Sequence, residues 1–183
     1  MNPIAFNLFG VSVRWYGVII TVGIIISGYI AISNAKRVNI KADDITDYIL
    51  VAMPFCIIGA RLYYVFFQWE YYKGDILKIV NVRQGGLAIH GGIIAGILVA
   101  YFYCKKKKLK FLEFFDIICV SIPLGQSIGR WGNFTNSEAY GTQTNLPWAI
   151  EINGNMVHPT FLYESLWNLA LFIFLIILFR RKR

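Results

Sequence analysis

Two parts of the sequence carry side chains that could do chemistry, and the first is a single histidine. His90 lies between two glycine pairs in the run Gly85-Gly86-Leu87-Ala88-Ile89-His90-Gly91-Gly92. Glycines permit close backbone approach and tight helix packing in membranes. A histidine titrates near neutral pH and can serve as a general base or proton carrier. A lone histidine on an apolar face is usually a core residue, but the flanking glycines favour a functional role here.

The second part runs from Gly129 to Gly141, where polar side chains directly follow an apolar run. It contains one arginine, two asparagines and one glutamate: Arg130, Asn133, Asn136 and Glu138. A planar guanidinium suits phosphate recognition, and side-chain amides can orient hydroxyl groups. If the stretch is helical, Arg130, Asn133 and Ser137 share a face. The alternative is a polar cap at a membrane interface.

Two further candidates lie within apolar runs, where ionisable side chains are costly and default to functional candidates. Arg61 lies well inside the second run, so either it contacts a substrate or it forms a structural ion pair with Glu113, Asp116 or Glu164. Tyr16 could direct its hydroxyl into a polar cavity. Arg14 lies at the edge of its run, where its side chain can reach the interface.

Other patterns point away from metal, protease and nucleic-acid chemistry. Gly125-Gln126-Ser127-Ile128-Gly129 matches G-x-S-x-G, but that nucleophile motif needs a strand-turn-helix context that an apolar run does not supply. The three cysteines show no CxxC spacing, so we expect neither a zinc site nor disulfides. We expect no metal, no cofactor and no nucleic-acid partner.

The elements that must position these residues are predicted to be membrane helices. The chain of 183 residues is 57% hydrophobic and only 15% charged, against about 25% charged in soluble domains. Apolar runs of this length form helices in lipid. We therefore predict an all-α polytopic bundle in a single domain, 1–183, with about five transmembrane spans at 13–33, 46–67, 86–104, 111–129 and 159–179. We expect the fourth span to be broken or tilted, because it carries Glu113, Asp116 and Pro123. We find no cleavable signal peptide.

Charge placement predicts the orientation of these spans. Twelve of the eighteen basic residues lie in the connections after the first and third spans and in the tail. The opposite side holds only Lys73, Lys78, Arg83 and Arg130. Because basic residues concentrate in cytoplasmic loops, we predict an exterior N-terminus and a cytoplasmic C-terminus. The polar 130–158 stretch then faces the exterior.

With these residues in view, the sequence resembles the bacterial prolipoprotein diacylglyceryl transferases. Five motifs carry the resemblance in the right order and span nearly the whole chain: Arg14-Trp15-Tyr16-Gly17, Gly59-Ala60-Arg61-Leu62, Gly85 to Gly92, Gly129 to Glu138, and His158-Pro159-Thr160-Phe161-Leu162-Tyr163-Glu164.

The resemblance implies an enzyme of the bacterial plasma (inner) membrane with its site on the outer face. Such an enzyme moves the diacylglyceryl group of phosphatidylglycerol to the lipobox cysteine thiol of a prolipoprotein, forming a thioether and releasing glycerol phosphate. Arg130 would hold the phosphate and His90 would be the candidate base. The substrate-binding residues would be Tyr16, Arg61, Asn133, Asn136, Glu138 and Gly141.

Two departures from the family pattern bear on activity. Ser137 stands where the family usually has glycine, and the chain ends at Arg183 where family members continue through two further helices. That further part includes a tyrosine and an arginine important for activity. The alternatives are therefore a truncated or noncatalytic phospholipid-binding homologue or, with less support, a small channel or transporter.

Overall fold

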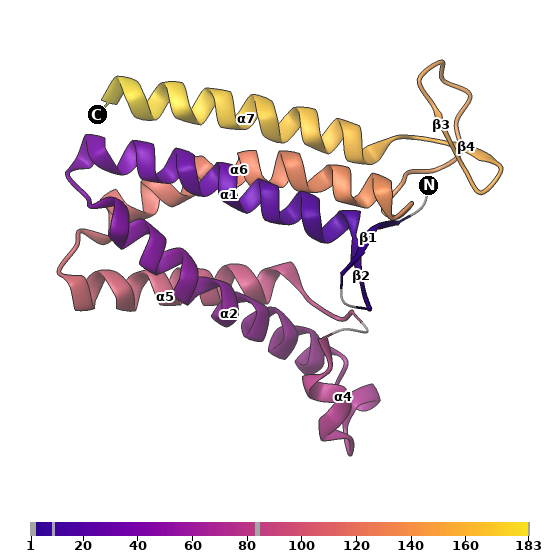
Figure 1. The fold of residues 1–183 in the computed structure, drawn as a ribbon, viewed down its shortest axis with the longest axis horizontal. Coiled ribbons are helices and arrows are strands. Elements are labelled where there is room, and N and C mark those ends of the chain that lie inside the picture. Colours follow the sequence, from indigo (N-terminus) through magenta and orange to yellow (C-terminus); the bar gives the residue numbers. More distant parts are fainter. Residues whose placement is uncertain (1–2, 9, 83–84, 183) are drawn as a thin grey trace. The chain divides into compact units, whose positions relative to one another are not determined.

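The computed structural model describes residues 3–8, 10–82 and 85–182, and most of them are helical. The elements follow one another along the chain (Figure 1) as β1 (Ile4–Leu8), β2 (Val11–Arg14), α1 (Trp15–Ala35), η1 (Lys36–Val38), α2 (Ala42–Phe67), α3 (Trp69–Tyr72), α4 (Ile76–Val80), α5 (Ile89–Lys107), α6 (Phe111–Thr135), β3 (Ile150–Ile152), β4 (Asn155–Val157) and α7 (Thr160–Lys182).

In the part of the chain that the structure describes, four helices are long and apolar enough to cross a membrane: α1 with η1, α2, α6 and α7. The polytopic helical class predicted from the sequence is confirmed. The predicted span 86–104 corresponds to α5, which is not among these four. It contains His90 and ends in Lys105, Lys106 and Lys107, and these polar residues lower its mean hydropathy. Pro123 lies inside α6 without ending it.

Two compact units make up the chain, one formed by residues 1–37 and 116–183 and the other by residues 38–115. In the second unit, α2 and α5 run antiparallel and side by side (Figure 1). Near one end of the pair, a Cβ on Gly59 would lie 2.7 Å from the Gly91 carbonyl oxygen, so only glycine allows this approach.

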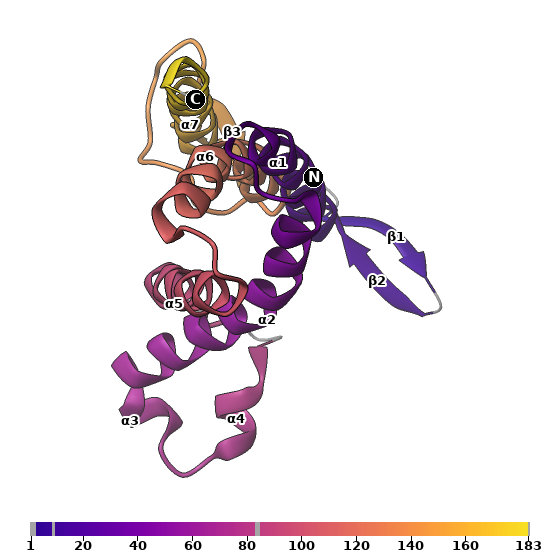
Figure 2. The same cartoon turned by 90° about the vertical axis from the view of Figure 1, so that its left-hand side faces the viewer.

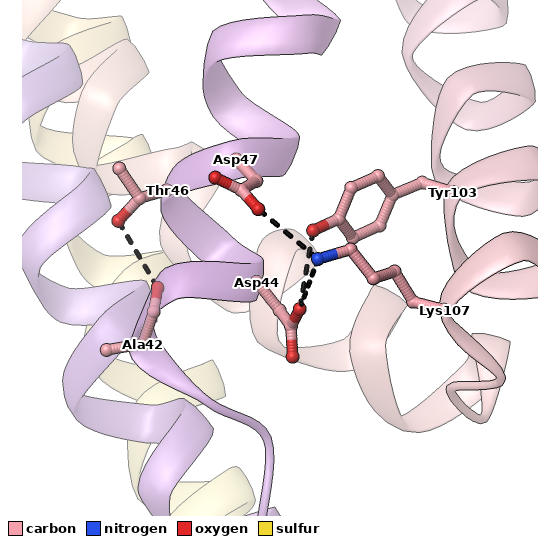
Figure 3. Close-up of polar contacts among 6 residues, drawn as sticks. All are labelled: Ala42, Asp44, Thr46, Asp47, Tyr103 and Lys107. Carbon is pink, nitrogen blue, oxygen red and sulfur yellow. Dashed lines mark hydrogen bonds and ion pairs between the residues drawn. The ribbon is translucent and has the colours of Figure 1, made fainter.

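The other end of the α2–α5 pair is joined by charges (Figure 3). Lys107 Nζ lies 3.2 Å from Asp44 Oδ1 and 3.3 Å from Asp47 Oδ2. The Tyr103 hydroxyl lies 3.5 Å from the same Asp44 oxygen. Asp44 is in the first turn of α2 and Lys107 in the last turn of α5, where each charge also complements the helix dipole. The two ends together fix the alignment of the helices.

The first unit packs α1 against α6 through a row of glycines. A Cβ on Gly125 would lie 2.8 Å from Ser27 Oγ, and one on Gly129 would lie 3.1 Å from Ile20 Cδ1. Small residues at such spacing let membrane helices approach closely. The hairpin β1–β2 leads directly into α1 (Figure 2), and the short hairpin β3–β4 precedes α7.

Two serines join α6 to α7 in the same unit. Ser127 Oγ donates to the Ser165 carbonyl at 2.8 Å, and Ser165 Oγ donates to the Ser127 carbonyl at 2.9 Å. Trp131 Nε1 adds a hydrogen bond to Ser165 Oγ at 3.2 Å. Ser127 is therefore a buried helix-packing residue, which agrees with its rejection as a nucleophile.

Candidate functional site

The arginine of the polar segment lies in the last turns of α6 and forms an ion pair. Arg130 Nη2 contacts Glu164 Oε2, which α7 supplies one turn after its start. The two side chains are 35% and 45% exposed, so the guanidinium is anchored yet accessible. Glu164 was a candidate partner of Arg61 in the sequence, but in the structure it forms an ion pair with Arg130. A bound anion could therefore use the guanidinium edge that Glu164 leaves open.

Tyr16 lies beside this arginine's helix, packed against Gly132. A Cβ on Gly132 would lie 2.8 Å from Tyr16 Cδ2. The ring therefore rests directly on the α6 backbone, two residues from Arg130, and it remains 38% exposed. The close approach of α1 and α6 thus brings Tyr16 to the polar end of α6.

The segment after α6 folds back on the helix end through amide and carboxylate groups. Asn133 Nδ2 donates to Glu138 Oε1 at 3.1 Å, and Asn136 Nδ2 donates to the same oxygen at 3.4 Å. The side-chain oxygen of Asn136, Oδ1, is buried and has no hydrogen-bond partner among the residues that the structure describes. Ser137 lies outside the helix with φ +53°. The face predicted to hold Arg130, Asn133 and Ser137 thus ends before Ser137, since α6 stops at Thr135.

Gly141 ties this segment to the start of α7. Its N–H donates to the His158 carbonyl at 3.0 Å, and a Cβ there would lie 2.8 Å from His158 Cβ. The hydroxyl of Thr160 also donates to the Ala139 carbonyl. Gly141 therefore sets the approach of the polar segment to α7, which carries Glu164.

The structure adds an aromatic network near this end of α7 that the sequence did not single out. Trp148 Nε1 donates to the Tyr163 hydroxyl at 2.8 Å. The same hydroxyl lies 3.2 Å from His158 Nδ1. The only signal in the sequence was the motif from His158 to Glu164. The first unit thus holds Tyr16, Arg130, Asn133, Asn136, Glu138 and Gly141 together with Glu164.

The second unit holds the other two candidates, His90 and Arg61. His90 is the second residue of α5 and is exposed, and its ring stacks on Tyr63 with centroids 5.9 Å apart. Arg61 is only 5% exposed, and its guanidinium donates to backbone carbonyls. His90 is therefore available to a substrate, whereas Arg61 is engaged within the protein.

A pocket of about 430 Å³ lies between α6 and α7, away from the polar segment. Its lining includes Asp116, Cys119, Leu175, Phe179 and Lys182. Asp116 precedes Arg130 by fourteen residues of helix, or roughly 21 Å at 1.5 Å per residue. This pocket is therefore separate from the candidate site. Among the described residues, no three His, Cys, Asp or Glu side chains gather in a way that could hold a metal ion.

The sequence matches one protein family over nearly its whole length. The family model described as prolipoprotein diacylglyceryl transferase matches residues 3–183. The chain is 51% identical over 183 residues to the phosphatidylglycerol–prolipoprotein diacylglyceryl transferase of Finegoldia magna, covering 100% of this chain and 74% of that protein. The Clostridioides difficile protein of the same name is also 51% identical, with 73% of its length covered. The one from Clostridium botulinum strain Langeland is 47% identical, with 76% covered.

These matches agree with the family resemblance that the five sequence motifs carry. The similarity covers all of the present chain and about three quarters of each relative. By both the family match and the relatives, the chain belongs to the prolipoprotein diacylglyceryl transferase family of membrane enzymes.

Proposed function

We propose that this protein transfers the diacylglyceryl group of phosphatidylglycerol to the lipobox cysteine thiol of a prolipoprotein. The names of its relatives specify the lipid and the protein substrate. The four apolar helices support a multi-pass membrane enzyme. We place it in the bacterial plasma membrane, with the site on the outer face. Basic connections favour the cytoplasmic side, and the site residues lie at the helix ends away from those connections.

The reaction exchanges one bond to carbon for another. The cysteine sulfur attacks the glyceryl carbon that carries the phosphate, a thioether C–S bond forms, and the C–O bond to phosphate breaks. The thiol proton goes to a base, and glycerol phosphate leaves with the electron pair of the broken bond. The phosphate gains negative charge as it leaves, so a fixed cation at that oxygen stabilises the transition state.

The anchored guanidinium of Arg130 is the observation that carries this proposal. Its ion pair with Glu164 restricts the side chain, while partial exposure keeps donors available. Arginine can offer two parallel N–H groups to a phosphate. We assign Arg130 to the phosphate, where it would act both in binding and on the departing charge.

The amide and carboxylate cluster next to Arg130 suits the glycerol headgroup. Asn133 and Asn136 both donate to Glu138, so the three side chains form one rigid group. The buried Asn136 Oδ1 has no donor in the described part of the chain, and an unpaired polar group of this kind costs about 1–3 kcal/mol. A headgroup hydroxyl is a suitable donor. Tyr16 would border the lipid, and Gly141 would hold the cluster against α7.

His90 is our candidate for the base that accepts the thiol proton. Its exposed ring, held by stacking on Tyr63, leaves a nitrogen for a substrate. The competing chemistry needs no base, because arginines beside the thiol would themselves favour the thiolate. If His90 is the base, its loss should abolish transfer. If the arginines alone favour the thiolate, transfer should continue without His90.

The proposal is tested with the purified full chain, phosphatidylglycerol vesicles and a synthetic lipobox peptide. Mass spectrometry should detect the peptide with one diacylglyceryl group added. Arg130→Ala and His90→Ala should abolish the product, whereas Arg37→Ala, which changes an exposed arginine in η1, should leave it unchanged. Binding of phosphatidylglycerol without any lipidated peptide would contradict the enzymatic reading and identify a noncatalytic lipid-binding protein.

A further inference from the structure

Arg61 has an unusual environment for a charged side chain. It lies near the end of α2, a helix apolar enough to cross a membrane, and it is 5% exposed. Buried charges are normally paired with an opposite charge. In the described parts of the chain no carboxylate lies within ion-pair distance of Arg61; backbone carbonyls surround its guanidinium.

Every N–H of this guanidinium has its own acceptor. Arginine carries five N–H donors, and the five acceptors are the carbonyl oxygens of Lys78 at 2.6 Å, Ile79 at 2.8 Å, Asn81 at 3.0 Å, Gly85 at 2.7 Å and Gly86 at 2.8 Å. The Tyr72 ring covers the guanidinium carbon at 4.9 Å. A lipid phosphate could reach Arg61 only by displacing one of these bonds.

The carbonyls of Lys78 and Ile79 belong to the end of α4, and the other three belong to the connection between α4 and α5. Gly85 and Gly86 have φ +86° and +79°, values that L side chains rarely adopt, and this backbone turns both carbonyls toward Arg61. A Cβ on Gly86 would lie 2.3 Å from Arg61 Nη1, whereas one on Gly85 would meet nothing within 4 Å. The glycine pair thus provides the backbone shape that the guanidinium binds.

The same stretch of α2 continues to hold the chain up to His90. The Ala88 N–H donates to the Ala60 carbonyl at 3.0 Å. The close contact of Gly91 with Gly59 then seats the first turn of α5, and Tyr63 stacks on the His90 ring. The residues from Gly59 to Tyr63 therefore contact the incoming segment at successive points that end at His90.

We propose that Arg61 is a positioning residue for His90, acting through the backbone of residues 78–81 and 85–86, and that it is not a lipid ligand. In this role, its charge is satisfied by carbonyl dipoles, and its five-donor geometry fixes the path by which the chain enters α5. Lysine, with three donors and no planar fork, cannot replace it. The consequence for transfer rests on the proposed function of His90.

Two variants test this from opposite sides. Arg61→Lys keeps the charge and removes the fork. Gly86→Ala keeps Arg61 but adds a methyl group that clashes with its guanidinium. Gly85→Ala is the matched control, because it adds similar backbone strain and its methyl group does not contact Arg61. We expect Arg61→Lys and Gly86→Ala to lower kcat by on the order of 10- to 100-fold with little change in KM for phosphatidylglycerol. The kcat of Gly85→Ala should decrease clearly less than the kcat of these two variants.

Amide hydrogen exchange gives a readout that does not depend on activity. Residues 78–90 should exchange faster in Arg61→Lys and Gly86→Ala than in Gly85→Ala, with α6 and α7 unchanged. Unaltered exchange in this segment would overturn the proposal, even if the wild-type chain proved unable to transfer lipid. A rise in KM with unchanged kcat in Arg61→Lys would instead identify Arg61 as a lipid ligand. If Arg61→Lys fails to fold, the comparison of Gly86→Ala with Gly85→Ala decides.

Discussion

At the scale of single residues, the backbone at Ser137 favours a glycine at this position. With φ +53°, Ser137 adopts the left-handed conformation in which glycine has no steric penalty. Ser137→Gly removes about 1–2 kcal/mol of strain, and the greater freedom of the unfolded chain offsets up to about 1 kcal/mol. We expect a net gain of about 0.5–1 kcal/mol in the free energy of unfolding, measured by thermal denaturation in detergent. Ser137→Ala, which keeps the strain, should show no gain.

Glu164 gives a second prediction at this scale. Its ion pair with Arg130 is partly exposed, so its contribution to stability should be under about 1 kcal/mol. Its effect on transfer should be larger, because it restricts the guanidinium that we assign to the phosphate. We expect Glu164→Ala to lower kcat/KM about tenfold or more and Glu164→Gln, which can still accept a hydrogen bond, to lose less. Equal activity of wild type and Glu164→Ala would show that the ion pair does not orient Arg130.

The residue types near the site were predictable, but their partners were not. Arg130, Asn133 and Glu138 were predicted as site residues because they are polar and directly follow an apolar run. The pairing of Arg130 with Glu164 joins positions 34 residues apart, and no local pattern encodes it. For Arg61 the sequence suggested either a substrate or a carboxylate partner and not backbone carbonyls, because side chains can be read from a sequence and the positions of backbone carbonyls cannot.

At the scale of elements, the α1–α6 contact makes Gly132 a sensitive position. A methyl group there would lie 2.8 Å from the Tyr16 ring, which would have to move or separate the helices. We expect Gly132→Ala to destabilise the protein by about 1–3 kcal/mol, as overpacking does, and to reduce transfer. Thermal denaturation and the peptide assay measure the two effects.

Gly17→Ala is the control, because a Cβ there meets nothing within 4 Å. Adding Tyr16→Ala to Gly132→Ala should recover part of the lost stability, since it removes the clashing ring. A Gly132→Ala protein as stable as Gly17→Ala would contradict the close packing of α1 on α6.

Helix positions followed well from hydropathy, and helix ends did not. The second run was predicted from residue 46, yet α2 begins at Ala42, because Asp43 and Asp44 are polar but favoured in a first helical turn. The fourth run was predicted to end at 129, yet α6 continues to Thr135 through the polar segment. The hairpin β3–β4 was not predicted, although Asn153-Gly154 with φ +52° and +78° forms its turn and Asn-Gly is a known hairpin signal.

At the scale of the whole molecule, the side of the membrane that each connection faces depends on α5. This helix has 19 residues, or roughly 28 Å, close to the thickness of a bilayer core. If α5 crosses, the connection after α2 and the polar segment after α6 face the same side. If it does not cross, the two connections face opposite sides.

Cysteine labelling distinguishes these arrangements. In a chain whose three cysteines are replaced by alanine, we expect a membrane-impermeant maleimide to label Gly74→Cys and Ser137→Cys in intact cells or spheroplasts. Asn39→Cys, in the basic connection after α1, and Lys106→Cys, in the basic last turn of α5, should be labelled only after lysis. Labelling of Gly74→Cys without Ser137→Cys would mean that α5 does not span. Because the proposed reaction needs thiol, lipid phosphate and base at one membrane face, that result would exclude His90 and Arg130 from a shared site.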